Sequence, residues 1–205
     1  MNNRKKSDDK FNKFVMIALV SVMIIAVGIY AYTQLVEKES VSTDQDQPPL
    51  AKPSEIVLTV SMNNQNYNYS FGELTSLEAM VGKGKYINKI GKITGPYNYT
   101  GVSIPVFLDS IGNVPDNYSL KAVASDNYSI DYTYEEAQGT VMVYNETGGE
   151  IGIRNMTMII AYQENKEVLT DESGGPLRIA FIDEDGSITQ SGSWLRSLVE
   201  LQVID

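Results

Sequence analysis

The chain has 205 residues, with 16 Lys and Arg against 26 Asp and Glu, and it contains neither cysteine nor histidine. Its formal net charge of −10 disfavours a nucleic-acid partner, because an acidic surface repels a phosphate backbone. The missing residue types exclude disulfides, the usual ligands of zinc, haem and iron–sulfur centres, and nucleophiles activated by histidine. We therefore expect no metal ligands and assign no catalytic residue.

An uncharged, mostly apolar segment spans 14–36 near the amino terminus. Its 23 residues exceed the roughly 20 that a helix needs to cross a bilayer core. Residues 1–13 carry five basic and two acidic side chains, which predicts a cytoplasmic tail and an extracytoplasmic body. A cleaved signal peptide is the alternative, but its apolar core would be only about 7–15 residues. The pattern favours an uncleaved, single-pass anchor in the cell membrane.

The segment 37–53 is polar and contains Pro48, Pro49 and Pro53, which is typical of an extracytoplasmic linker. We expect the folded body to occupy 54–205. Beyond the anchor the chain has 11 basic and 24 acidic residues, so this body is acidic.

The first half of the body predicts strands over 55–61 and 67–71. A short helix through Leu74, Leu77 and Met80 follows, with Ser70 or Thr75 as its cap. We interpret 83–93 as one strand. The clearest helix lies within 100–112, with Ser103 as N-cap, Pro105 in the first turn and Gly112 at its end.

The second half predicts a strand over 120–125 and a short helix from the capping-box spacing of Thr133 and Glu136. Further strands are expected at 141–144, 156–162, 177–182 and 199–204, with a Gly-rich turn between the first two of these. One helical turn is expected within 191–196. Many short strands, few helices and no βαβ rhythm indicate the α+β class.

Two acidic stretches are candidates for an ion site or a catalytic site. Asp183 to Ser187 resembles a calcium loop but lacks the glycine and the glutamate that such a loop needs, so we interpret it as a turn. A carboxylate group around the predicted helix at 133–136 is interpreted as solvated; it comprises Asp126, Asp131, Glu135 and Glu136.

Six Asn-X-Ser/Thr sequons lie in the body, and they are candidate glycosylation sites of an exported protein: Asn68, Asn98, Asn117, Asn127, Asn145 and Asn155. The alternative is turn-and-strand chemistry, in which Asn begins a turn and the following Tyr and Ser or Thr enter a strand. The sequence leaves both interpretations open.

The stretch Glu172–Ile182 combines a tight turn at Gly174, Gly175 and Pro176 with an apolar run that contains Arg178. An arginine there is either solvated at the mouth of a strand or paired with an anion, because arginine is rarely buried without a partner. Trp194, further on, is expected to anchor the core.

Four blocks in order resemble the oxidoreductase molybdopterin-binding domain of the sulfite oxidase type, over about the last half of the chain. They are Tyr99–Gly112, Ala122–Ser129, Met158–Asn165 with Leu169, and Gly174–Phe181 followed by Trp194-Leu-Arg196. The resemblance implies an α+β body with mixed sheets. It also implies cofactor-binding positions at Gly174, Gly175, Pro176, Arg178, Trp194, Arg196, Asp126 and Tyr128.

Enzymes of that family hold molybdenum through a cysteine placed upstream of the segment that matches Tyr99–Val102, and they clamp the pterin phosphate with Arg, Lys and His. This chain has neither Cys nor His, and Asn127 stands where the family has glycine. Only the resemblance suggests molybdopterin as a cofactor, and we expect no bound cofactor.

These observations predict a mixed-sheet, sulfite oxidase molybdopterin-domain-like α+β body preceded by one N-terminal transmembrane helix. The expected role is a surface binding or accessory module that does no molybdenum chemistry. Its expected partners are the membrane, a small anionic or organic ligand, and a membrane or surface protein. The alternatives are an oxidoreductase subunit that holds a molybdopterin non-covalently and a structural cell-surface glycoprotein.

Overall fold

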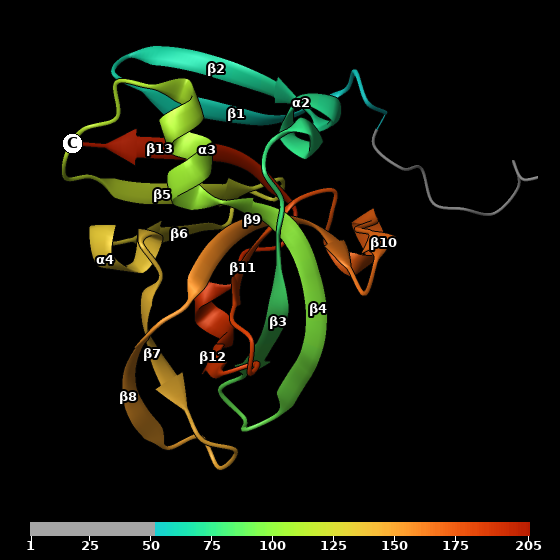
Figure 1. Ribbon diagram of the computed structural model, residues 1–205, viewed down its shortest axis with the longest axis vertical. Coiled ribbons are helices and arrows are strands. Elements are labelled where there is room, and N and C mark those ends of the chain that lie inside the picture. The colour runs from blue at the N-terminus through green and yellow to red at the C-terminus, as the bar shows by residue number, and fades with distance from the viewer. Residues whose placement is uncertain (1–51) are drawn as a thin grey trace, which may run out of the picture. The chain divides into compact units, whose positions relative to one another are not determined.

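The computed structural model describes residues 52–205, which belong to one compact unit (Figure 1). The predicted cytoplasmic tail, the anchor and all but the last two residues of the predicted linker lie outside the described residues and stay predictions. Within 52–205 every helix is too short or too polar to cross a membrane.

The first sheet has five strands and contains the carboxyl-terminal strand near its centre (Figure 1). Its β1–β13 pair is parallel and its other pairs are antiparallel. In spatial order the strands are β2 (Gln65–Ser70), β1 (Ile56–Met62), β13 (Leu198–Ile204), β5 (Ser119–Ala124) and β6 (Ser129–Tyr132).

The second sheet has eight strands and is also mixed, because β12 pairs in parallel with β3 and the other pairs are antiparallel. Its path is β10 (Glu167–Val168), β9 (Thr157–Glu164), β4 (Ile93–Ser103), β3 (Met80–Ile87), β12 (Ile188–Gln190), β7 (Thr140–Tyr144) and β8 (Glu150–Asn155), with β11 (Arg178–Ile182) paired to β9. These two sheets confirm the α+β class and the mixed pairing.

The short helices begin where local capping chemistry places them. α2 (Phe71–Ser76) and α4 (Tyr134–Ala137) both begin with capping boxes, formed by Ser70 with Glu73 and by Thr133 with Glu136. In the first box, hydrogen bonding from Ser70 lowers the pKa of the Glu73 carboxyl. α3 (Ile104–Ile111) is capped by Ser103, whose hydroxyl accepts from the Val106 N–H, and it ends at Gly112, as predicted. Two 3-10 turns, η1 (Asp171–Ser173) and η2 (Ser191–Ser193), complete the set.

The core is centred on β9 and β11, which lie side by side. All five residues of β11 are buried, and their partners on β9 run in register from Ala161 opposite Arg178 to Thr157 opposite Ile182. The run 177–182 is therefore the buried strand that its apolar sequence predicts, and the charged Arg178 is buried with it.

Several predicted elements differ in the structure. The helix after Ser70 ends at Ser76, and Met80 lies in β3, where it pairs with Gly101. The stretch 83–93 is not one strand: it holds the end of β3, a turn closed by hydrogen bonds between Asn88 and Lys92, and the start of β4. The Gly-rich stretch after Tyr144 includes β8, and β6, β10 and β12 were not predicted. Their short polar sequences become strands because a neighbouring strand supplies the hydrogen bonds.

Candidate functional site

Arg178 is enclosed by two aromatic rings and one carboxylate. Its guanidinium carbon lies 5.4 Å from the ring centroids of both Tyr99 and Trp194, and its Nη1 donates to Glu164 Oε2 at 3.3 Å. The arginine side chain is only 4% exposed, against 25% for Glu164. Arg178 is thus buried and paired with an anion, the second of the two arrangements expected from the sequence, and the anion is the carboxylate of Glu164 within the protein.

The rings around Arg178 are held by their own contacts. Trp194 Nε1 donates to Thr189 Oγ1 at 2.7 Å inside the protein, and the Trp194 ring packs against Tyr86 and Tyr99 with centroids 4.9 and 5.5 Å away. Burial raises the pKa of the Tyr99 hydroxyl, an effect that the neighbouring Arg178 partly offsets. Trp194 is therefore the core anchor expected from the sequence.

Close approach of these rings requires a glycine beneath them. A Cβ on Gly84 of β3 would lie 2.6 Å from Trp194 Cη2 and 2.8 Å from Tyr99 Cδ2, which is closer than real Cβ atoms approach other atoms. The two aromatic rings of the Arg178 cluster thus pack directly onto the bare backbone of β3.

The segment Gly174–Leu177 runs beside the segment 195–198. Leu198 N–H donates to the Leu177 carbonyl at 2.9 Å, and Ser197 N–H donates to the Gly174 carbonyl at 2.7 Å. Gly174 has φ of 84°, and a Cβ there would overlap the side chain of Arg196. The two glycines and the cis bond before Pro176 therefore form the tight turn that the sequence predicts, and Gly174 leaves the space that Arg196 occupies.

A pocket of about 300 Å³ lies beside this turn. Its lining brings together Ala124, Ser125, Asp126, Tyr128, Trp194, Arg196 and Ser197. The loop that joins β5 to β6 supplies the acidic side of the pocket. There Asn127 adopts φ of 67°, its N–H donates to the Ala124 carbonyl, and Asp126 Oδ1 accepts from the Tyr128 N–H at 2.9 Å. Asn127 therefore adopts the left-handed backbone conformation at the position where the family that the sequence resembles has glycine, because asparagine tolerates such angles.

Arg196 contributes a cation to the same pocket. Arg196 is exposed, and its Nη2 donates to the Glu172 carbonyl at 3.5 Å. Within residues 52–205 Arg196 has no ion-pair partner. Its guanidinium thus presents donors to a ligand, and in the same pocket Asp126 presents a carboxylate and the exposed Tyr128 presents a ring.

Four of the eight predicted site residues therefore line one pocket: Asp126, Tyr128, Trp194 and Arg196. The other four do not line the pocket: Gly174, Gly175, Pro176 and Arg178. Of these, Gly174 lies against the side chain of Arg196. Trp194 connects the two regions, because it lines the pocket and also covers Arg178.

Neither Glu164 nor Gly84 was predicted from the sequence to belong to the Arg178 cluster. Glu164 and Tyr99 both stand inside blocks of the resemblance, but pairing them with Arg178 requires the β9–β11 and β4–β9 registers. Ser125 and Ser197 were also missed. Their backbones meet where Ser125 N–H donates to the Ser197 carbonyl, a contact between residues 72 positions apart that local sequence does not indicate.

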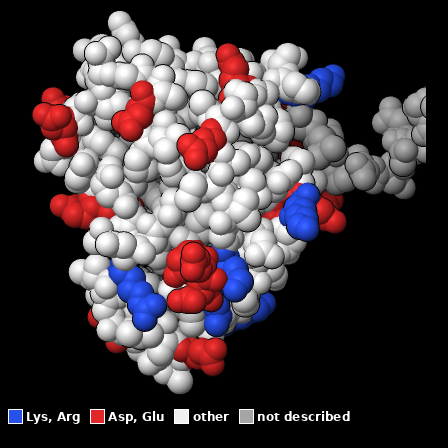
Figure 2. All heavy atoms as spheres, viewed as in Figure 1, with Lys and Arg blue, Asp and Glu red and all other residues white. Residues whose placement is uncertain are grey.

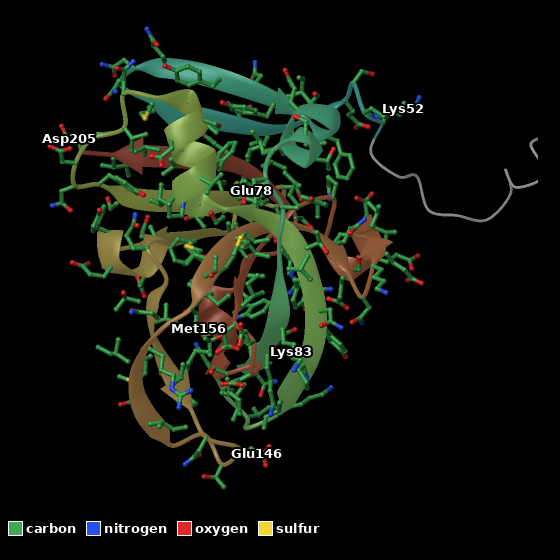
Figure 3. The ribbon with its side chains drawn as sticks, in the orientation of Figure 1. Lys52, Glu78, Lys83, Glu146, Met156 and Asp205 are labelled. Atoms are coloured by element: carbon green, nitrogen blue, oxygen red, sulfur yellow. The ribbon has the colours of Figure 1, made fainter. Side chains whose placement is uncertain are left out.

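The other candidate cations lie elsewhere. Lys85 of β3 pairs at 3.5 Å with Glu146, and Figure 3 labels Glu146 in the turn between β7 and β8. Figure 2 shows acidic side chains scattered over the visible face of the described residues, where the basic groups form no continuous surface. The lysines of 83–92 thus do not converge with Arg178 and Arg196 on one pocket.

The acidic stretch 183–187 forms an ordinary turn, whereas Asp126 of the other acidic group lines the pocket. Asp183 Oδ1 accepts from the N–H groups of Gly186 and Ser187, which closes the 183–187 turn. Within 52–205 no three acidic side chains gather as a metal site would require. A second, open hollow of about 550 Å³ lies between the β1–β2 turn and the end of β13, and it holds none of the predicted site residues.

All six sequon asparagines are exposed. Three also use their side chains locally: Asn145 Oδ1 accepts from the N–H groups of Thr147 and Gly149, Asn68 Oδ1 accepts from Thr59, and Asn155 Oδ1 accepts from Thr140. Exposure is compatible with glycosylation, and the local bonds are compatible with the turn-and-strand alternative.

The residues present do not fit a molybdenum cofactor. The whole chain lacks a thiolate to bind the metal. Of the two arginines at family positions, Arg178 is already paired with Glu164, and Arg196 shares its pocket with Asp126. A carboxylate beside the single available cation opposes the binding of a doubly charged phosphate.

No family model matches the sequence, and no curated protein matches it. Among solved structures, the chain is similar to the sulfane dehydrogenase SoxCD from Paracoccus pantotrophus, with a TM-score of 0.53 and 14% sequence identity. The match covers 75% of this chain and 39% of the SoxCD chain, so the protein corresponds to less than half of that chain. At this identity the likeness concerns the fold alone, and it supports a sulfite oxidase-like α+β body.

Proposed function

We propose that this protein is a membrane-anchored, extracytoplasmic binding module built on a sulfite oxidase-like fold, without molybdenum chemistry, and that it takes a small organic anion. The observation that carries the proposal is the pocket that joins Arg196, Asp126 and Tyr128 in a chain that has no metal-binding thiolate or imidazole.

The ligand class follows from the lining. Arg196 suits a carboxylate or sulfonate, because a guanidinium donates two parallel hydrogen bonds to such groups. Tyr128 suits a flat ring, and Asp126 suits an N–H donor on the same ligand. A volume of about 300 Å³ is at the lower end of the range for small-molecule sites. A flat nitrogen heterocycle with one acidic substituent combines these features.

The test uses pterin-6-carboxylate as a fluorescent probe and inorganic phosphate as a probe without a ring. We expect the full-length chain in detergent to bind the pterin acid and to bind phosphate at least ten times more weakly. Arg196→Gln should weaken binding of the pterin acid about 10- to 100-fold, since a hydrogen bond to a charged group contributes about 1.5–3 kcal/mol. Lys89→Gln, which also removes one exposed cation but lies outside the pocket, is the control. Equal affinity of Arg196→Gln and the unmodified chain would contradict the proposed pocket.

The absence of molybdenum chemistry has a separate test. Elemental analysis of the purified chain should find molybdenum and tungsten far below one equivalent, and a stoichiometric amount of either metal would overturn this part of the proposal. Pterin fluorescence in the denatured protein, without added probe, would instead favour the oxidoreductase-subunit alternative.

The exposure of all six sequon asparagines motivates the surface-glycoprotein alternative. Intact-mass measurement of the protein from its own cells distinguishes the two functions. Heterogeneous glycan masses together with no binding of the pterin acid would favour the structural glycoprotein.

A further inference from the structure

Strand β8 forms a free edge of the eight-stranded sheet. It pairs with β7 on one side, and within residues 52–205 no strand pairs with its other side (Figure 1). Five of its six residues are exposed, and Gly152 is half-buried. Such an edge presents unpaired N–H and C=O groups to any strand that can align with it.

The side chains of this edge are unusual for an unprotected strand. Ile151 and Ile153 are 58% and 68% exposed, and Ile153 lies opposite Met142 of β7. Lysine and proline, which often protect a free edge, are absent from β8, and its charged residues are Glu150 and Arg154. Ile151 is one extra residue of β8 between the pairs Glu150–Tyr144 and Gly152–Val143, and from Gly152 to Asn155 the pairing is regular.

The sequence Glu150-Ile-Gly-Ile-Arg154 is complementary to itself in one direction only. If two copies align antiparallel about Gly152, Ile151 lies opposite the partner's Ile153 and Glu150 lies opposite the partner's Arg154. Because the arrangement is twofold, each of these pairs occurs twice. In a parallel alignment with the same register, Glu150 would face glutamate and Arg154 would face arginine, and like charges directly opposite each other destabilise a sheet.

The described residues leave these groups available for pairing. Neither Glu150 nor Arg154 takes part in an ion pair within residues 52–205. A Cβ added to Gly152 would meet nothing within 4 Å, so a second strand can approach the backbone closely at the centre of the alignment.

We propose that two copies of this chain associate through antiparallel pairing of β8 with β8, which continues the eight-stranded sheet across a twofold axis. The interface is isologous, as in most homodimers. A contact made by one pair of short strands is small, so the dimer should form reversibly and depend on protein concentration.

Charge reversal provides the test, measured as the dissociation constant from sedimentation velocity of the full-length chain in detergent. We expect the unmodified chain to dimerise. Glu150→Arg and Arg154→Glu should each weaken the dimer at least tenfold, because each places like charges opposite each other twice. An equal mixture of the two variants should recover the dimer, because every pair across the interface then joins opposite charges.

Two controls separate this interface from misfolding and from other contacts. Both variants should keep the circular dichroism spectrum and melting temperature of the unmodified chain, since the changed residues are exposed. Glu167→Arg, an exposed glutamate on β10 at the opposite end of the sheet path, should leave dimerisation unchanged.

A crosslinking measurement tests the register. The chain has no cysteine, so Ile151→Cys and Ile153→Cys each introduce the only thiol. A mixture of the two should form the mixed disulfide under mild oxidation faster than either variant alone forms its own. A monomeric unmodified chain at millimolar concentration, variants that dimerise normally, or a mixture that fails to recover would each overturn the proposal.

Discussion

The enclosure of Arg178 predicts an asymmetric response to mutation of its ion pair. At 3.3 Å and an effective dielectric constant of about 20, the attraction between the two charges is about 5 kcal/mol before desolvation is subtracted. Glu164→Ala leaves a guanidinium that is 4% exposed and whose Nε already lacks a hydrogen-bond partner within residues 52–205. Removing one partner of a buried pair costs about 3–5 kcal/mol, and water that reaches the partly exposed Glu164 position should reduce this to about 2–3 kcal/mol.

The reverse change should cost less. Arg178→Met keeps an unbranched side chain between Tyr99 and Trp194, and the carboxylate of Glu164, which is 25% exposed, can bind water instead. Two cation–π contacts and the ion pair's net contribution are lost, and contacts of the methionine sulfur with the same two rings replace part of them, which leaves a net loss of about 1–2 kcal/mol. The free energy of unfolding should therefore fall further in Glu164→Ala than in Arg178→Met.

Urea unfolding followed by tryptophan fluorescence measures both losses. With a slope of about 2 kcal/mol per molar urea, Glu164→Ala should lower the midpoint by about 1–1.5 M. The matched control is Glu146→Ala in the Lys85–Glu146 pair, whose carboxylate is 81% exposed and whose loss should cost at most about 0.5 kcal/mol. Equal losses in the two ion pairs, or a greater loss in Arg178→Met than in Glu164→Ala, would refute the enclosed-cation reasoning.

Three further predictions concern other parts of the body. Gly84→Ala should destabilise by about 1–3 kcal/mol and change the near-ultraviolet circular dichroism of Trp194, the only tryptophan, whereas Gly192→Ala, whose Cβ meets nothing within 4 Å, should change little. Ser103→Ala should cost about 1 kcal/mol in urea unfolding through loss of the α3 cap, and an unchanged midpoint would contradict that role. Burial raises the pKa of Tyr132, so its neutral form is favoured in the folded state. The resulting stability is complete below the unfolded pKa of about 10 and is lost as pH rises above it, by up to about 1.4 kcal/mol per pH unit. Tyr132→Phe should therefore make the loss of stability between pH 10 and 11 less steep than in the unmodified chain.

Local chemistry made much of the secondary structure predictable. The Ser103 cap of α3 and the Thr133–Glu136 capping box of α4 each join residues three positions apart, so their spacing in the sequence is sufficient to locate the helix starts. The buried strand 177–182 was likewise visible as an apolar run. Strand β8 was not, because Gly152 interrupts its short sequence and its conformation depends on pairing with β7.

The residues of the candidate site were predictable from the sequence, but their environments were not. The resemblance predicted four of the residues that line the pocket: Asp126, Tyr128, Trp194 and Arg196. The composition alone excluded a thiolate ligand, because the chain has no cysteine. Which arginine is available to a ligand could not be read, because the environment of each arginine depends on residues brought close only by the fold. Arg178 receives its carboxylate partner from β9 and its aromatic covers from Tyr99 and Trp194. The sequence alone therefore determined the acidic composition, the helix caps and the absence of thiol and imidazole ligands. The internal pairing of Arg178 and the position of Arg196 at a pocket follow from the tertiary fold, because burial and charge pairing are set by contacts between distant segments.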